Sequence, residues 1–149
     1  MVGGASRRAE ALSIRTKERW HLDVFLVEDS AGLGQRLVAE LEEVVGVRVV
    51  GWAENEADAT AAITRLRPRF VVLDLRLTQG SGLGVLAAVK RLDPPPIVAV
   101  LTNYPEPQYR ARCAELGADY FFSKAAGLDG LLEACRCAAG ATEELGNHA

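Results

Sequence analysis

Short apolar segments alternate with amphipathic segments between residues 22 and 140. Leu22–Val27 is one such apolar run, and it ends abruptly in Glu28, Asp29 and Ser30. Residues 70–73 and 97–101 are also almost continuously apolar. Runs of this length and composition are typical of strands buried on both faces of a parallel sheet. Two further strands are predicted over residues 47–53 and 120–122.

The intervening segments repeat apolar side chains every three or four residues, which predicts amphipathic helices. Ser30 is placed to cap the first helix and Asn55 the second. A run of three prolines at 94–96 is expected to break the third helix, and Pro105 and Pro107 fit the start of the fourth. The predicted inward stripes are, helix by helix, Leu33, Leu37, Leu41 and Val44; Ala59, Ile63 and Leu66; Leu83, Leu86, Val89 and Leu92; and Leu128, Leu131, Leu132, Cys135, Ala138 and Ala139.

Five strands that alternate with five helices predict an α/β fold with a single doubly wound five-stranded parallel sheet. Short connections make right-handed crossovers between neighbouring elements the expected topology. The hydrophobic pattern does not reveal the order of the strands in the sheet.

The 149-residue chain is expected to form one domain over residues 22–140, followed by a short C-terminal tail at 141–149. Residues 1–21 differ from the rest, with five basic and two acidic residues, whereas the remainder holds 12 basic and 18 acidic residues. We expect a flexible basic N-terminal extension, with a transit-like or nucleic-acid-touching arm as the alternative. The acidic body argues against broad phosphate-backbone binding.

Composition excludes several classes of protein. No stretch approaches the roughly 18 apolar residues of a membrane-spanning helix, and the N-terminus has no apolar core of a secretory signal. His21 and His148 lie near the chain ends, so a histidine site in the core is excluded. Cys113, Cys135 and Cys137 do not form a zinc-binding pattern and are interpreted as reduced thiols of a cytoplasmic protein.

Polar residues follow four of the predicted strands. Glu28 and Asp29 close the first, Asp74 the third, Thr102 the fourth and Lys124 the fifth. Because the carboxyl ends of parallel strands share one edge, where ligand sites form, we expect these side chains to converge. Clustered carboxylates suit Mg²⁺, and a carboxylate beside Mg²⁺ can accept a phosphoryl group. A lysine and a hydroxyl would neutralise and orient the phosphoryl oxygens.

Each of these residues also has a structural interpretation. Asp29 can serve as a helix cap, Asp74 as a turn residue, Thr102 as the cap of the next helix and Lys124 as a solvated loop residue. The functional interpretation rests on the whole set falling at one edge of the sheet.

Four motifs, in order, resemble the receiver domain of two-component response regulators across roughly residues 22–140. They are the acidic-ended strand at 24–30, the strand and loop at 71–82 around Asp74, the strand at 98–102, and the segment 117–124 that ends in Lys124. The resemblance implies the flavodoxin-like (βα)5 fold with strand order 2-1-3-4-5.

The resemblance also implies residue roles. Asp74 would be the phospho-acceptor, while Thr102 and Lys124 would bind phosphoryl oxygens. Mg²⁺ would be ligated directly by Asp29 and Asp74, and through water by Glu28.

Two further roles follow from the same resemblance. The backbone carbonyl of Arg76 would complete the Mg²⁺ ligands. Phe121 would be the aromatic residue of a switch that Thr102 triggers, with core packing as the alternative interpretation of that ring.

Three positions depart from the family pattern. Ala125 stands where a cis proline usually follows the lysine, Asn103 where a small residue follows the threonine, and Thr78 where proline is common. Larger side chains after Thr102 could narrow access to the phosphoryl group. None of the departures removes a reacting group.

The expected function is a non-enzymatic receiver that a histidine kinase or phosphotransfer protein phosphorylates, acting alone by contact with a downstream protein, as a monomer or phosphorylation-dependent dimer. No nucleic-acid or membrane partner is expected for this chain. The candidate contact residues are Tyr109, Arg110 and Tyr120. The alternatives are the receiver part of a DNA-binding regulator, and a pseudo-receiver that is never phosphorylated. A flavodoxin-like protein and a phosphatase fit poorly, because Glu28 and Asp29 repel phosphate and Arg76 replaces the second phosphatase aspartate.

Overall fold

The computed structural model describes the backbone of residues 21–148 and the side chains of residues 21–142. The predicted basic extension therefore lies almost wholly outside the described residues. Within the described part, no helix combines the length and the apolar content that a membrane crossing requires.

Five parallel strands form one sheet in the order β2-β1-β3-β4-β5, as the family resemblance predicts. Sequence order changes direction between β1 and β3, so β2 and β5 are the edge strands. The strands are β1 (Leu22–Val27), β2 (Val47–Ala53), β3 (Phe70–Leu73), β4 (Ile97–Thr102) and β5 (Tyr120–Ser123).

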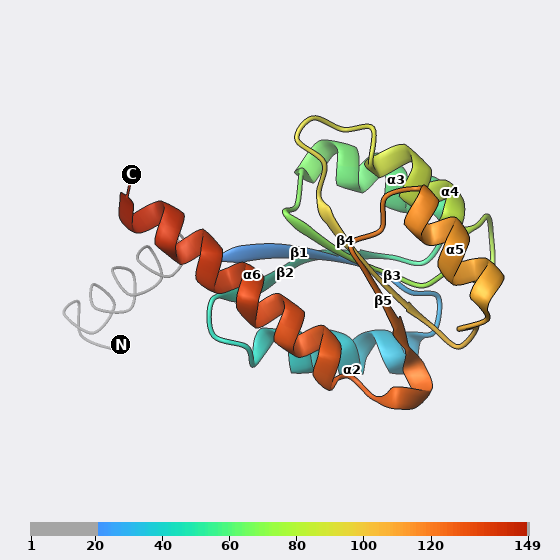
Figure 1. The fold of residues 1–149 in the computed structure, drawn as a ribbon, viewed down its shortest axis with the longest axis horizontal. Helices are drawn as coiled ribbons and strands as arrows, with labels where there is room; N and C mark the ends of the chain where they lie inside the picture. The colour runs from blue at the N-terminus through green and yellow to red at the C-terminus, as the bar shows by residue number, and fades with distance from the viewer. Residues whose placement is uncertain (1–20, 149) are drawn as a thin grey trace, which may run out of the picture.

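Helices cover both faces of the sheet (Figure 1). Two of them, α2 (Ala31–Glu42) and α6 (Asp129–His148), lie on one face. The opposite face carries α3 (Glu56–Leu66), α4 (Gly82–Val89) and α5 (Pro107–Glu115). A short 3₁₀ turn, η1 (Lys124–Ala126), joins β5 to α6. The predicted α/β fold with a doubly wound five-stranded parallel sheet is confirmed.

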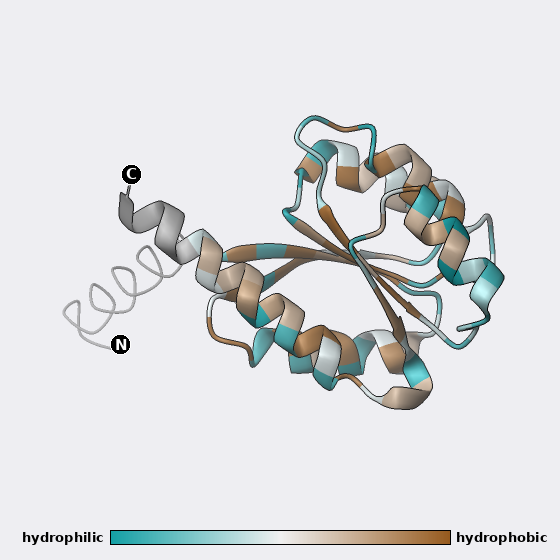
Figure 2. Ribbon diagram, in the orientation of Figure 1, coloured by the Kyte–Doolittle hydropathy of each residue, from teal (hydrophilic) through white to brown (hydrophobic). Residues whose placement is uncertain are grey.

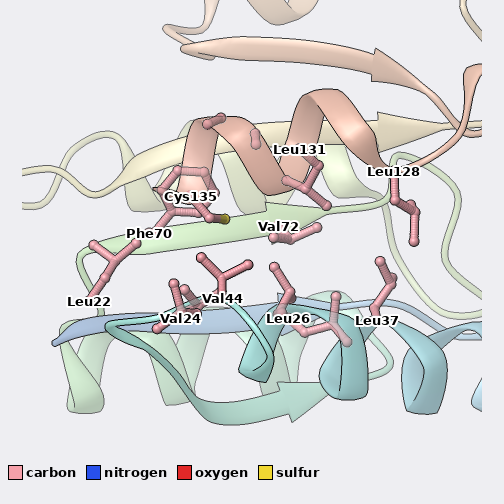
Figure 3. Packing of buried hydrophobic residues seen from close by; sticks show 14 of the residues in the cluster. Leu22, Val24, Leu26, Leu37, Val44, Phe70, Val72, Leu128, Leu131 and Cys135 are labelled. Atoms are coloured by element: carbon pink, nitrogen blue, oxygen red, sulfur yellow. The ribbon is translucent and has the colours of Figure 1, made fainter. Parts of the chain in front are cut away.

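Alternate side chains of each central strand enter different hydrophobic cores, as the two-residue period of a strand requires. In β1, Val24 and Leu26 pack with α2 and α6, whereas Phe25 and Val27 pack with α3 and α4. Figure 3 shows the first core, in which Cys135 of α6 lies against Phe70. Apart from Asp23 in β1 and Thr102 at the end of β4, the central strands are therefore hydrophobic along their length (Figure 2).

The helix stripes are largely confirmed, with four differences. The first predicted helix ends at Glu42, so Val44, although buried, lies in the turn after α2. Leu66, predicted to face inward, is 40% exposed, because it closes α3 over Gly51 of the edge strand, which offers no side chain for it to pack against. The third predicted helix ends at Val89 and continues as a tight turn in which Arg91 and Leu92 bond three residues back. The last helix runs on to His148, through most of the predicted tail.

Trp52 of edge strand β2 ties the end of β1 to α2. Its indole N–H donates to the backbone carbonyl of Glu28 at 2.7 Å, just where β1 ends. The ring fits against Gly34 of α2, where an added Cβ would lie 2.0 Å from Trp52 Cζ2. The missing side chain at Gly34 therefore gives the indole its place.

Replacing Gly34 by alanine should destabilise the protein by about 1–3 kcal/mol, because the ring or the helix must move. In urea unfolding, Gly32→Ala in the same helix is the matched control, since nothing lies within 4 Å of the added methyl. The control should be neutral or stabilised by up to about 1 kcal/mol through helix propensity. Equal stability changes in the two variants would contradict the proposed fit of Trp52.

Candidate functional site

The register of the sheet brings Glu28 and Asp74 side by side. Val27 pairs with Leu73, so the residues that follow them leave adjacent strands at the same level. The ladder continues one step further, because the Asp74 N–H donates to the Val27 carbonyl at 3.0 Å and the Glu28 N–H to the Ala53 carbonyl at 3.1 Å. Both carboxylates are consequently fixed at their backbones and buried, at 1% and 6% exposure.

Lys124 reaches the two carboxylates from the far side of the site. Thr102 pairs with Ser123 in the last step of the β4–β5 ladder, and Lys124 follows directly. Its ammonium lies 2.9 Å from Glu28 Oε1 and 3.0 Å from Asp74 Oδ2. One cation thus bridges two buried anions from strands β1 and β3.

The ionisation of this trio reflects burial and charge together. Burial raises the pKa of the Glu28 carboxyl and the Asp74 carboxylate adds to the rise, against hydrogen bonds from Lys124 and the Ser30 N–H that lower it. Burial by itself would lower the pKa of the Lys124 ammonium. Its bonds to Glu28 and Asp74 outweigh that effect, so the pKa lies above the usual lysine value.

Three carboxylates form a candidate metal site. Oxygens of Glu28, Asp29 and Asp74 lie within 4.8 Å of one another, and Asp29 is only half-buried, which leaves it accessible. Carboxylate oxygens are ligands that Mg²⁺ prefers, and it commonly keeps several waters. The donor set therefore fits Mg²⁺. Arg76 contributes a backbone N–H to Asp74 Oδ1 at 3.4 Å, while metal ligation by its carbonyl stays a prediction.

Thr102 ends β4 at the same edge and is fully buried. Its hydroxyl oxygen accepts a hydrogen bond from the Tyr104 N–H at 3.0 Å, which closes the start of the loop after β4. The Tyr104 ring in turn carries the Arg76 guanidinium 4.1 Å from its centroid. The loops after β3 and β4 are thereby joined beside Asp74.

Phe121 of β5 pairs with Val100 of β4, two residues before the Thr102–Ser123 pair at the end of the ladder. Its ring is half-buried against the α3–α5 core, and the Arg110 guanidinium lies 4.6 Å from its centroid. The structure places Phe121 beside α5, between core and surface. Its role as a switch residue stays a prediction.

The loop between β3 and α4 is held on two sides. Gly82 begins α4 directly against the end of β3, where an added Cβ would lie 2.1 Å from the Asp74 carbonyl oxygen. From α3, Glu56 Oε1 accepts the Ser81 N–H at 2.8 Å, and the Glu56 N–H donates to the Gln79 carbonyl at 3.1 Å. Within the loop, the Thr78 hydroxyl donates to Asp29 Oδ2 at 2.8 Å.

Comparison with known proteins matches residues 24–136 to the response regulator receiver domain. This chain belongs to the response regulator receiver domain family. Receiver domains belong to two-component signalling, and phosphorylation and Mg²⁺ binding are characteristic of them.

Individual relatives of this receiver agree with the assignment. A protein described as a transcriptional regulator from Pseudomonas aeruginosa is 34% identical over 115 residues, 76% of this chain and 54% of the relative. A protein-glutamate methylesterase/protein-glutamine glutaminase of Caulobacter vibrioides is 33% identical over 74% of this chain and 33% of its own length. The receiver therefore spans about half, or less, of these longer relatives.

Among solved structures, the receiver resembles the signal receiver domain of the response regulator NarL from Mycobacterium tuberculosis. The TM-score is 0.74 at 26% identity, over 80% of this chain and 97% of that domain.

Sequence reasoning missed several supporting contacts of this receiver. The bonds from Trp52 to Glu28, from Thr78 to Asp29 and from Tyr104 to Thr102 all support residues that were singled out. The first two join positions 24 and 49 residues apart, so no local pattern reveals them. Thr78 was noted only as a departure from the family pattern.

Replacing Lys124 by methionine should destabilise the protein by about 3 kcal/mol near neutral pH, because two buried carboxylates lose their cation. A carboxyl whose pKa is raised by folding weakens the fold once it ionises, so the loss should grow from pH 5 to pH 8. Urea unfolding at both pH values measures it. An equal loss at both would mean that packing of the lysine stem, rather than charge, accounts for the effect.

Proposed function

We propose that Asp74 is the residue that accepts a phosphoryl group from a histidine kinase or phosphotransfer protein, in a Mg²⁺-dependent reaction. The observation that carries the proposal is the Lys124 bridge to Glu28 and Asp74 within a cluster of three carboxylates. Bound Mg²⁺ would supply positive charge to the phosphoryl oxygens. Asp29 and Asp74 would hold it directly, Glu28 through water and Arg76 through its carbonyl.

The transfer itself requires little covalent machinery from the protein. An Asp74 carboxylate oxygen forms a bond to phosphorus while the bond between phosphorus and the donor histidine nitrogen breaks, and that nitrogen keeps the electron pair. Lys124 then exchanges its contact with the Asp74 carboxylate for one with a phosphoryl oxygen. Its ammonium, which already bridges two carboxylates, supplies the positive charge for that contact.

Thr102 would trigger the conformational switch. Its oxygen is bonded to the Tyr104 N–H in this structure, so a move toward a phosphoryl group would break that bond and shift the loop after β4. This loop leads into α5, and the side chain of Arg110 in α5 covers the Phe121 ring. A downstream protein would recognise the resulting change on the face made by α5, β5 and α6, where Tyr120 is exposed.

Incubation with acetyl phosphate and Mg²⁺ should add one phosphoryl group, about 80 Da, to the intact mass, because activated carboxylates form acyl phosphates. The group should be released by hydroxylamine. Asp74→Asn and a sample with excess chelator are the controls, and both should stay unmodified.

A stable mimic guards against a short-lived acyl phosphate. Beryllofluoride with Mg²⁺ should bind the wild type and shift its amide NMR spectrum around Thr102 and Phe121, and should leave Asp74→Asn unchanged. If neither reagent modifies or binds the wild type, the phospho-acceptor proposal fails and the pseudo-receiver interpretation replaces it.

A second candidate places the same receiver within a longer regulator. Its support is that the chain spans 54% of the Pseudomonas aeruginosa relative, which is described as a transcriptional regulator. An antibody against this receiver, applied to extracts of the source cells, separates the candidates. A band at the mass of this chain supports a receiver that acts alone, and a heavier band supports the longer regulator.

A further inference from the structure

We propose that Thr78 is a positioning residue for the metal site, because its hydroxyl fixes the carboxylate of Asp29. The inference rests on the proposed Mg²⁺-dependent function of this edge. It concerns a residue outside the set of carboxylates, lysine and threonine described above, and it assigns to the β3–α4 loop a part in metal affinity.

Asp29 is the least constrained of the three carboxylates. Glu28 Oε2 accepts the Ser30 N–H and its other oxygen contacts Lys124, while Asp74 contacts both Lys124 and the Arg76 N–H. Asp29, half-buried, has one such contact in the described structure, the 2.8 Å bond from Thr78 Oγ1 to Oδ2. The least constrained of the three carboxylates is therefore oriented by a hydroxyl of the β3–α4 loop.

The bond leaves Asp29 able to ligate a metal. A carboxylate has two oxygens and several lone pairs, so occupation of Oδ2 by a hydroxyl proton leaves Oδ1 available. A hydrogen bond to an ionised carboxylate is also stronger than one between two neutral groups. Hydrogen bonds of this kind hold ligands in orientation, and their loss costs roughly 10- to 100-fold in metal affinity.

Thr78 can orient Asp29 because hydrogen bonds hold the β3–α4 loop in a defined conformation. Glu56 of α3 holds Ser81 and Gln79 through one side-chain and one backbone hydrogen bond. The Gly82 N–H donates to the Leu75 carbonyl at 2.9 Å, which closes the loop on itself. Thr78 lies between these two anchors, so its hydroxyl has a defined position relative to β1. The contacts that α3 and β3 make with this loop thus help to orient Asp29.

The test is a Mg²⁺ titration of the full chain, followed by the fluorescence of Trp52. Its indole N–H is bonded to the backbone carbonyl of Glu28, one of the three carboxylate residues. The sequence contains two tryptophans, and Trp20→Phe leaves Trp52 as the single reporter. Titration calorimetry on the same samples gives an independent dissociation constant.

Thr78→Val removes the hydroxyl at nearly constant volume and should weaken Mg²⁺ binding by about tenfold. Thr78→Ser keeps the hydroxyl and should restore most of the affinity. Thr64→Val is the matched control: Thr64 is an exposed threonine of α3 whose hydroxyl bonds the Thr60 carbonyl, away from the carboxylates, and Mg²⁺ affinity should be unchanged. Thermal unfolding without metal should be alike for the Thr78 variants, which separates positioning from a loss of stability.

The outcomes distinguish the two levels of the proposal. One outcome refutes the role of Thr78 but leaves the metal site standing: the wild type and Thr78→Val bind Mg²⁺ equally tightly, whereas Asp29→Asn does not bind it. If Thr78→Ser is as weak as Thr78→Val, the hydroxyl is not the group responsible, and the role is refuted as well. If the wild type itself binds no Mg²⁺, the proposed metal-dependent function fails and takes this inference with it.

Discussion

The arrangement of this protein depends on a single ammonium group placed between two buried carboxylates. Taking charges out of water is costly, and neighbouring anions add repulsion to that cost. Lys124 offsets both for Glu28 and Asp74, but only if β1, β3 and the end of β5 arrive at one level. The parallel sheet and its register provide that alignment. This electrostatic constraint therefore joins the ends of the first, third and fifth strands at the edge where chemistry is proposed.

Two kinds of contact surround this ammonium and its carboxylates, and they differ in how easily they can be broken and replaced by others. The backbones of Glu28 and Asp74 are part of the sheet ladder and cannot move without breaking it. The contacts of Thr102, Arg76 and Lys124 with their neighbours are single side-chain or loop interactions. A receiver needs both kinds, because a rigid platform must present the acceptor while a few bonds exchange when charge is added. The division falls between the strand ends and the loops that follow them.

The sequence was most informative where a residue's position follows from periodicity. Apolar runs placed β1, β3 and β4, the residues that close them lie at one edge, and the 3–4 spacing of α6 correctly buried Cys135. Periodicity predicted burial wrongly where burial depends on the packing partner. Leu66 has the spacing of an inward residue, but it packs over a glycine of an edge strand. Contacts such as Thr78 with Asp29 depend on loop geometry between distant positions, which no periodic pattern encodes. Strand order came from resemblance alone.

The course of α6 separates two regions of the molecule. The helix starts just after Lys124, at the acidic edge, and then runs back along the sheet face toward the opposite end (Figure 1). Its 20 residues correspond to about 30 Å of travel at 1.5 Å per residue. The acidic edge, where a phosphoryl donor is proposed to bind, and the distal end of this helix are therefore separated by about the length of the helix.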